Sequence, residues 1–99
     1  MLETFTQATF SEQLNTKFRV HVADPDVVDI ELTEVAPGRQ TPRQEQFSIL
    51  FRGPGDAFFG QGNYRIEHEK MGTFDLLLVP VAKDDTGFYY EAVFNRLRQ

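Results

Sequence analysis

The sequence predicts an all-β fold, a small antiparallel barrel or sandwich of about six strands with a short N-terminal helical turn. Apolar and polar residues alternate with a period of two in six separate runs, as they do in strands that bury one face. Clusters rich in Gly, Pro and Asp separate the runs and favour turns. Because 99 residues is a common size for one domain, we expect residues 1–99 to form a single domain.

The six strands are expected at residues 17–22, 27–35, 46–52, 63–69, 73–81 and 87–95. The longest interval between them, 36–45, is expected to be a polar surface loop. Before the first strand, Thr9 or Ser11 is expected to cap a helical turn. That turn would carry Phe10 and Leu14 on one side and cover an open end of the barrel.

The alternation also predicts how the first two strands pair. If inward side chains face one another, Val20 lies opposite Ile30 in an antiparallel pair. His21 then points outward, opposite Asp29. We expect it to form a surface pair of small energetic value.

The last two strands carry an unusual second apolar face. Pairing Leu78 with Tyr90 fills the inner face. The outer face, which is normally polar in a monomer, then holds a candidate interface made of Leu77, Val79, Val81, Tyr89 and Val93. We expect this face to be covered by another part of the chain, by a protein partner or by a second copy in a homo-oligomer. Pro80 lacks an N–H group and therefore favours a strand edge or a bulge.

The segment GPGDAFFGQG, residues 53–62, follows a strand as phosphate-binding loops do. It lacks the Gly-Lys-Ser/Thr ending of such loops, and the run after it alternates like a strand. We expect its glycines to provide positive φ angles. One of the rings of Phe58 and Phe59 should be buried, and the other, if exposed, makes this a candidate binding loop.

The composition argues against several partners. A net charge of -5 disfavours binding to nucleic acid. No stretch approaches the roughly 20 apolar residues that cross a bilayer, so we expect no membrane partner. The chain has no cysteine and no recognisable targeting segment, and we therefore expect it in the cytoplasm.

Residues for catalysis are few, since the chain has two histidines, two serines and no cysteine. Neither serine has the surroundings of a hydrolase nucleophile. His68 shares its strand face with Tyr64 and Ile66, which predicts a hydrogen-bonded histidine at the mouth of the core. Glu67 and Glu69 point to the opposite face, so these three groups cannot share a metal ion. We expect no enzyme activity, no catalytic residue, no cofactor and no metal site.

Four segments spread over nearly the whole chain occur in the order seen in one family. They are TFSEQLNTKFRV (9–20), FSILFRGP (47–54), QGNYRIEHEKMGTFDLLLVPV (61–81) and YYEAVFNR (89–96). On these segments the chain resembles a family of small bacterial all-β domains of unknown function. Some members are encoded near phage-tail-collar-like proteins, so the resemblance implies a structural or accessory role and brings no catalytic residues.

These observations predict a non-enzymatic interaction or structural accessory domain. The resemblance implies a phage-tail-like or surface assembly as its setting. The alternative function is a small barrel whose inward aromatic side chains enclose an apolar ligand.

Overall fold

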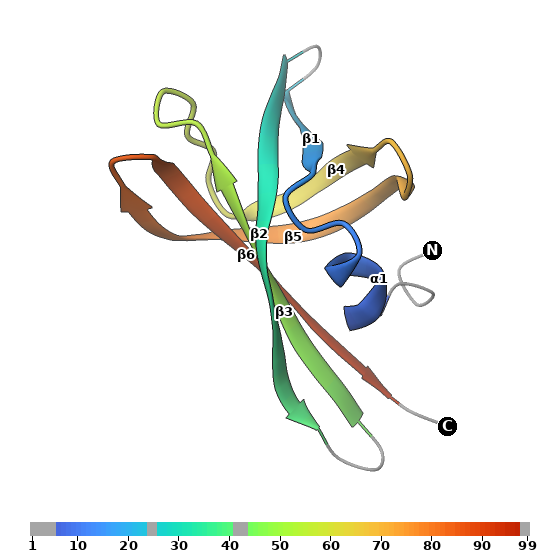
Figure 1. The fold of residues 1–99 in the computed structure, drawn as a ribbon. Helices are drawn as coiled ribbons and strands as arrows, with labels where there is room; N and C mark the ends of the chain where they lie inside the picture. Colours follow the sequence, from blue (N-terminus) through green and yellow to red (C-terminus); the bar gives the residue numbers. More distant parts are fainter. Residues whose placement is uncertain (1–5, 24–25, 41–43, 98–99) are drawn as a thin grey trace.

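The strands form one antiparallel sheet that closes on itself, as a computed structural model shows (Figure 1). The structure describes residues 6–23, 26–40 and 44–97. Its elements are α1 (Gln7–Ser11), β1 (Lys17–Ala23), β2 (Asp26–Gln40), β3 (Gln44–Gly53), β4 (Gly62–His68), β5 (Gly72–Asp84) and β6 (Gly87–Leu97). Around the closed sheet their order is β1-β2-β3-β6-β5-β4. The predicted all-β class with six antiparallel strands and a short N-terminal helix is confirmed.

Two joints between strands that are distant in the sequence close the sheet. The longer joins β3 to β6 through ten consecutive residue pairs that extend over all of β3, from Gln44 to Gly53. The shorter joins β1 to β4 through three pairs, with Val20 opposite Ile66 in the middle. The remaining joints connect strands that follow one another in the chain.

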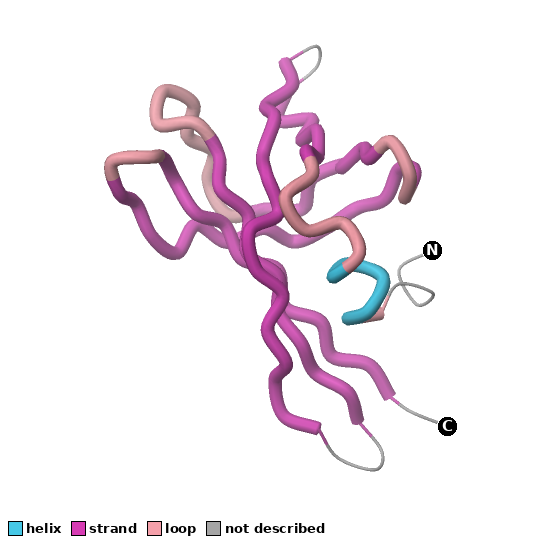
Figure 2. Tube along the Cα trace, in the orientation of Figure 1, coloured by secondary structure: helices cyan, strands magenta, loops and turns pink. Residues whose placement is uncertain are grey.

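The barrel is irregular because three strands extend beyond their neighbours. The pairing of β2 with β1 ends at Glu31, and the pairing of β6 with β5 ends at Glu91. Beyond these points β2, β3 and β6 continue as a three-stranded extension made of residues 33–40, 44–50 and 92–97, which we call the arm. The arm extends away from the barrel toward the bottom of the view (Figures 1 and 2).

The arm overturns the prediction of a surface loop over residues 36–45. Instead, β2 continues to Gln40 and β3 begins at Gln44. The Pro-Gly pair at Pro37 and Gly38 resembles a turn in the sequence. In the described chain, however, β2 pairs only with β3 along this stretch, and it bulges between Pro37 and Gln40. A proline is tolerated at such a strand edge because no neighbouring strand needs its missing N–H group.

The predicted register of the first hairpin is wrong by two residues. Val20 lies opposite Val28, and His21 lies opposite Val27. A shift of two residues leaves every side chain on the same face of the sheet, so the alternation predicts the inward residues but not the register. An irregularity between His21 and Ala23 accompanies this shift.

The register of the last hairpin is shifted by two residues as far as Pro80 and by three beyond the bulge that follows it. Tyr90 lies opposite Pro80, whereas Leu78 lies opposite Gly62 of β4. The strand bulges between Pro80 and Ala82, where the proline predicts an edge or a bulge. From Leu78 back to Gly72, β5 pairs with β4 along its other edge and has no pairing with β6 among the described residues.

Thr6 caps α1, in place of the predicted Thr9 or Ser11. The Thr6 hydroxyl accepts a hydrogen bond from the backbone N–H of Thr9 at 3.2 Å, and the Thr6 N–H donates to the Thr9 hydroxyl at 3.3 Å. This reciprocal arrangement is a capping box that uses threonine at its second position.

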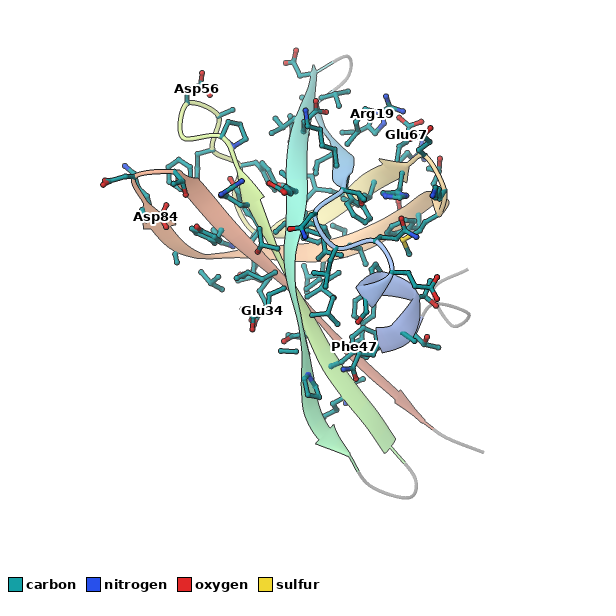
Figure 3. All side chains as sticks on the ribbon, viewed as in Figure 1. Arg19, Glu34, Phe47, Asp56, Glu67 and Asp84 are labelled. Carbon is teal, nitrogen blue, oxygen red and sulfur yellow. The ribbon has the colours of Figure 1, made fainter. Side chains whose placement is uncertain are left out.

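Phe10 of α1 fills the space between the arm and the barrel, as the predicted cover would. Its ring is fully buried, with ring centroids of Phe47, Phe74 and Phe94 at 6.1, 6.4 and 5.2 Å. Figure 3 shows Phe47 beside α1. Leu14 lies beyond the helix and is exposed, so Phe10 alone of the two predicted residues is buried.

Candidate functional site

A groove of about 370 Å³ lies where β5 and β6 separate. It is lined by Asn63 of β4, by Asp75, Leu76, Leu77 and Val79 of β5, and by Glu91, Ala92, Val93, Phe94 and Asn95 of β6. Successive residues of a strand point to opposite faces of the sheet. Residues that point to the inner face and residues that point to the outer face both line the groove. The groove therefore opens between the edges of the two strands.

Three residues of the predicted interface line this groove, and two do not. Leu77, Val79 and Val93 belong to the lining, with Leu77 48% and Val93 68% exposed. Val81 is 48% exposed but lies farther along β5, at the bulge. Tyr89 is half-buried and does not line the groove. The outer face is thus apolar, but the structure divides it into two parts.

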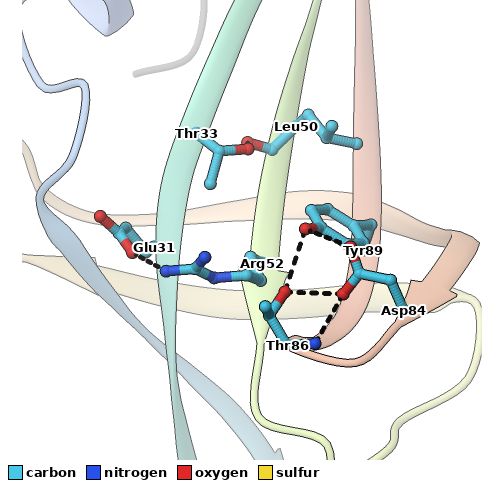
Figure 4. A network of polar contacts seen from close by, with 7 residues as sticks. All are labelled: Glu31, Thr33, Leu50, Arg52, Asp84, Thr86 and Tyr89. Atoms are coloured by element: carbon cyan, nitrogen blue, oxygen red, sulfur yellow. Dashed lines mark hydrogen bonds and ion pairs between the residues drawn. The ribbon is translucent and has the colours of Figure 1, made fainter.

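Tyr89 is held in a polar network at the turn between β5 and β6 (Figure 4). Its hydroxyl donates a hydrogen bond to Asp84 Oδ2 at 2.9 Å. The Thr86 hydroxyl and backbone N–H donate to Asp84 Oδ1 at 2.6 and 2.8 Å. These bonds, that of the Thr86 hydroxyl first, lower the pKa of Asp84. Tyr89 therefore stabilises the turn.

A second set of polar contacts limits the apolar face on the side of β2 and β3. Arg52 donates a hydrogen bond to Glu31 at 2.6 Å, and the Thr33 hydroxyl donates to the carbonyl of Leu50 at 3.1 Å (Figure 4). Arg52 lies opposite Tyr89 in the sheet. On the side of β2 and β3, these polar contacts therefore border the apolar outer face.

The groove itself carries two carboxylates. Asp75 is exposed and Glu91 is half-buried. In the described parts of the chain the ion pairs join Arg52 to Glu31 and His21 to Glu67, so neither groove carboxylate belongs to one. Arg65 is the cross-strand neighbour of Asp75 but does not form an ion pair with it.

The glycine-rich segment is anchored by Phe59. Its ring is buried and stacks on Tyr90 with centroids 4.0 Å apart and planes 2° apart. Its backbone N–H donates to the Tyr90 hydroxyl at 3.3 Å, while burial raises the pKa of Tyr90. The Tyr64 hydroxyl donates to the carbonyl of Gly60 at 2.6 Å. These contacts hold the loop against the barrel.

Phe58, the second aromatic residue of the candidate binding loop, is 58% exposed. Its ring centroid is 5.0 Å from that of Phe88, and Lys83 Nζ lies 5.2 Å from the Phe88 centroid. One ring of the Phe58–Phe59 pair is thus buried and one exposed. The exposed ring packs beside β6 instead of projecting alone.

The glycines with positive φ lie outside this segment, which corrects the prediction. In the described residues they are Gly72 and Gly87, the first residues of β5 and β6. Gly53 lies within the segment and is closely packed. A Cβ atom there would lie 3.1 Å from the Tyr90 ring and 3.2 Å from the Ile30 side chain.

His68 is buried and hydrogen-bonded, as predicted. Its Nδ1 accepts hydrogen bonds from the backbone N–H groups of Lys70 and Met71 at 3.0 and 3.2 Å, and its Nε2 lies 2.8 Å from the Thr16 hydroxyl. Burial lowers the pKa of His68. The predicted outward pair of His21 with Asp29 is wrong, since His21 Nε2 lies 2.5 Å from Glu67 Oε1.

A family model described as Domain of unknown function (DUF6916) matches residues 5–94. The chain belongs to the DUF6916 family. No curated protein and no solved structure gives a significant match to this DUF6916 chain. Within its described residues, no helix has the length and apolar character needed to span a bilayer.

The alternation of the DUF6916 sequence does not predict the groove. It assigns Leu77 and Val93 to an outer face, but it pairs the last two strands along their whole length. Asp75, Glu91 and Asn95 are therefore missed as members of a site.

Proposed function

We propose that this domain is a non-enzymatic protein-interaction domain that binds its partner at the groove between β5 and β6. The exposure of Leu77 and Val93 at this groove carries the proposal. Contiguous apolar surface on a soluble domain commonly marks a site of association. Loss of water from these side chains would supply a favourable free energy of binding.

The proposed setting is a bacterial, cytoplasmic one in which the domain serves a phage-tail-like or surface assembly. Support for the setting comes from the resemblance of the four sequence segments to their family. The absence of cysteine agrees with a reducing compartment. The net charge of -5 supports a protein partner over nucleic acid.

A chemical cross-linking experiment in extracts of the native host tests the function. The wild-type full chain is used as bait beside Val93→Lys and Val27→Lys. Val27 is a matched control because it is also an exposed valine, 42% accessible, and lies on β2 outside the groove. We expect a protein identified by mass spectrometry to be captured by wild type and Val27→Lys but not by Val93→Lys. Equal capture by both variants, or no specific capture, would overturn the proposal.

A homo-oligomer is the other form of association, and light scattering separates it from binding to a different protein. Wild type and Val79→Glu are compared over a range of concentrations. A wild-type mass above that of the 11.4 kDa chain, reduced to one chain in Val79→Glu, would assign the groove to a second copy. If wild type and Val79→Glu are both monomeric, the groove is assigned to a different protein.

The alternative function, binding of an apolar molecule inside the barrel, has less support. The side chains of Phe18, Phe51 and Tyr90 are fully buried in the interior. Phe18 and Phe51 pack edge to face with centroids 5.1 Å apart. Small barrels are normally filled by their own side chains in this way.

A further inference from the structure

We infer that the groove binds an extended, cationic segment of another protein, which adds as a strand to the edge of β6 from Ala92 to Leu97. This inference rests on the proposed function and specifies the partner and its mode of binding. From Ala92 onward, β6 pairs only with β3 in the described chain. Alternate backbone N–H and C=O groups of this stretch therefore point toward the groove, away from β3. They are the groups that an added strand uses.

The two edges of the arm differ in their ability to accept a strand. The β2 edge carries Pro37 and Gly38 and bulges between Pro37 and Gln40, and such features protect an edge from further pairing. The β6 edge pairs with β3 in unbroken register and has no proline or bulge from Ala92 to Leu97. Val93, the most exposed of the large hydrophobic residues described, lies within it. Of the two edges of the arm, the β6 edge is therefore the one with unbroken pairing and no proline or bulge.

The lining of the groove specifies how the side chains of the added strand must alternate. Leu76 and Phe94 line the groove from the inner side, where Leu76 is buried and Phe94 packs against the core. Side chains of the added strand that point inward should therefore be apolar. Those that point outward would lie beside Glu91 and Val93.

The negative charge of the groove indicates which side chains the added strand should carry on its outward face. Asp75 and Glu91 stand on the two strands that bound the groove, and neither belongs to an ion pair among the described residues. The chain as a whole carries a net charge of -5, which favours the approach of a cationic partner. Lys or Arg at outward positions would thus complement the groove.

A second copy of the chain fits the same edge less well. Two β6 strands related by a two-fold axis perpendicular to the sheet would keep the same outer face. Each outward, odd-numbered residue of one copy would then face an outward, odd-numbered residue of the other. Glu91 would lie opposite Val93, Asn95 or Leu97 of the other copy, and no cation would face it. Two chains of charge -5 would also repel each other.

Titration of the 15N-labelled full chain with the acetylated and amidated peptide KVTVKVTV tests the inference. This peptide places valines on one face and lysines and threonines on the other. We expect chemical-shift changes and slower amide exchange in residues 92–97. The charge-reversed peptide EVTVEVTV should bind about tenfold more weakly. Two N-methylated forms, modified at odd or at even positions, should differ, because only one set of N–H groups faces β6.

Variants of two glutamates provide matched controls. Glu34, Leu50 and Glu91 lie side by side across β2, β3 and β6, but only Glu91 lines the groove. Figure 3 shows Glu34 on the side of the arm away from α1. We expect Glu91→Gln to weaken binding of KVTVKVTV about twofold to fivefold, and Glu34→Gln to leave it unchanged.

The outcomes separate this inference from the proposed function. Absence of binding, equal binding of both N-methylated forms, or shifts confined to residues outside the groove would overturn strand addition. Val93-dependent capture of a host protein would still support the interaction domain in that case. If strand addition fails and capture does not depend on Val93, both proposals fail. A wild-type dimer that protects residues 92–97 would assign the edge to a second copy and overturn the inference.

Discussion

The Thr16 hydroxyl lies 2.8 Å from Nε2 of His68, and this contact joins the segment after α1 to the end of β4. Because Nδ1 accepts from the N–H groups of Lys70 and Met71, the neutral ring carries its proton on Nε2 and donates it to Thr16. The Thr16 hydroxyl donates in turn to the carbonyl of Gln13 at 2.6 Å. One imidazole ring thus holds both the β4–β5 turn and the N-terminal segment.

This arrangement predicts that acid destabilises the fold through His68. Burial lowers its pKa from the ordinary value of 6.5, so the unfolded chain binds the proton at a higher pH than the folded chain does. The free energy of unfolding should therefore fall as the pH drops below about 6.5, until the folded state also takes up the proton. A second proton on Nδ1 would face two N–H donors. Urea unfolding at pH 7.5 and 5.5 measures the effect, and a His68→Asn variant with the same pH dependence would contradict it.

Thr16→Val should lower the free energy of unfolding by about 1–3 kcal/mol, since it leaves the Nε2–H of a buried ring without its partner. Thr16→Ser keeps the hydroxyl and should retain most of the stability. Urea unfolding at pH 7.5 compares the three proteins. If valine and serine have equal effects, the hydrogen bond does not stabilise the fold.

Replacing Phe58 or Phe59, which are adjacent in the glycine-rich segment, with alanine should lower the free energy of unfolding by very different amounts. Phe59→Ala removes a buried ring stacked on Tyr90 and should cost about 3–5 kcal/mol. Phe58→Ala removes a ring that is mostly exposed and should cost less than about 1 kcal/mol. Thermal and urea unfolding of both variants measure the difference. Similar losses would show that the loop is not anchored through Phe59.

Gly87→Ala should destabilise the domain by about 2 kcal/mol or more. Gly87 has a φ of 147°, a conformation that side chains rarely adopt, and an added Cβ would overlap the carbonyl oxygen of Gly53. Gly60→Ala is the control, because nothing lies within 4 Å of a Cβ placed there. Its effect should stay within about 0.5 kcal/mol in the same unfolding assay. A mild effect at Gly87 would mean that the turn can rearrange.

The sequence predicts which side chains enter the core more reliably than which residues face one another. Phe18, Val20 and Tyr90 are buried as their alternation requires, although the cross-strand partners of Val20 and Tyr90 are each shifted by two residues. Alternation has a period of two, so it cannot detect a shift of two. The extension of β2 through Pro37 is missed for another reason. The composition around Pro37 resembles that of a turn. A strand can include this proline because, in the described chain, no other strand pairs with β2 on the edge away from β3 there.

The candidate site was predictable as an apolar face but not as a groove. Leu77 and Val93 follow from the alternation of the last two runs. The groove depends on a change along β5, whose pairing with β6 ends at Val79, and Asp75 and Glu91 line it from the two strands that part there. Such a change is set by the twist and closure of the whole sheet, which no local pattern encodes.

Closure of the sheet depends on a short joint. Among the described residues, three pairs connect β1 to β4, although His21 and Glu67 at this joint lie 46 residues apart in the chain. Closing this long loop costs conformational entropy, and few backbone hydrogen bonds offset that cost. Amide protons of this joint should therefore exchange with solvent faster than those between β3 and β6. Its opening would turn the closed barrel into an open, twisted sheet while every other strand pair stays intact. The first step of local unfolding in this protein would then be the loss of closure, with the sheet itself preserved.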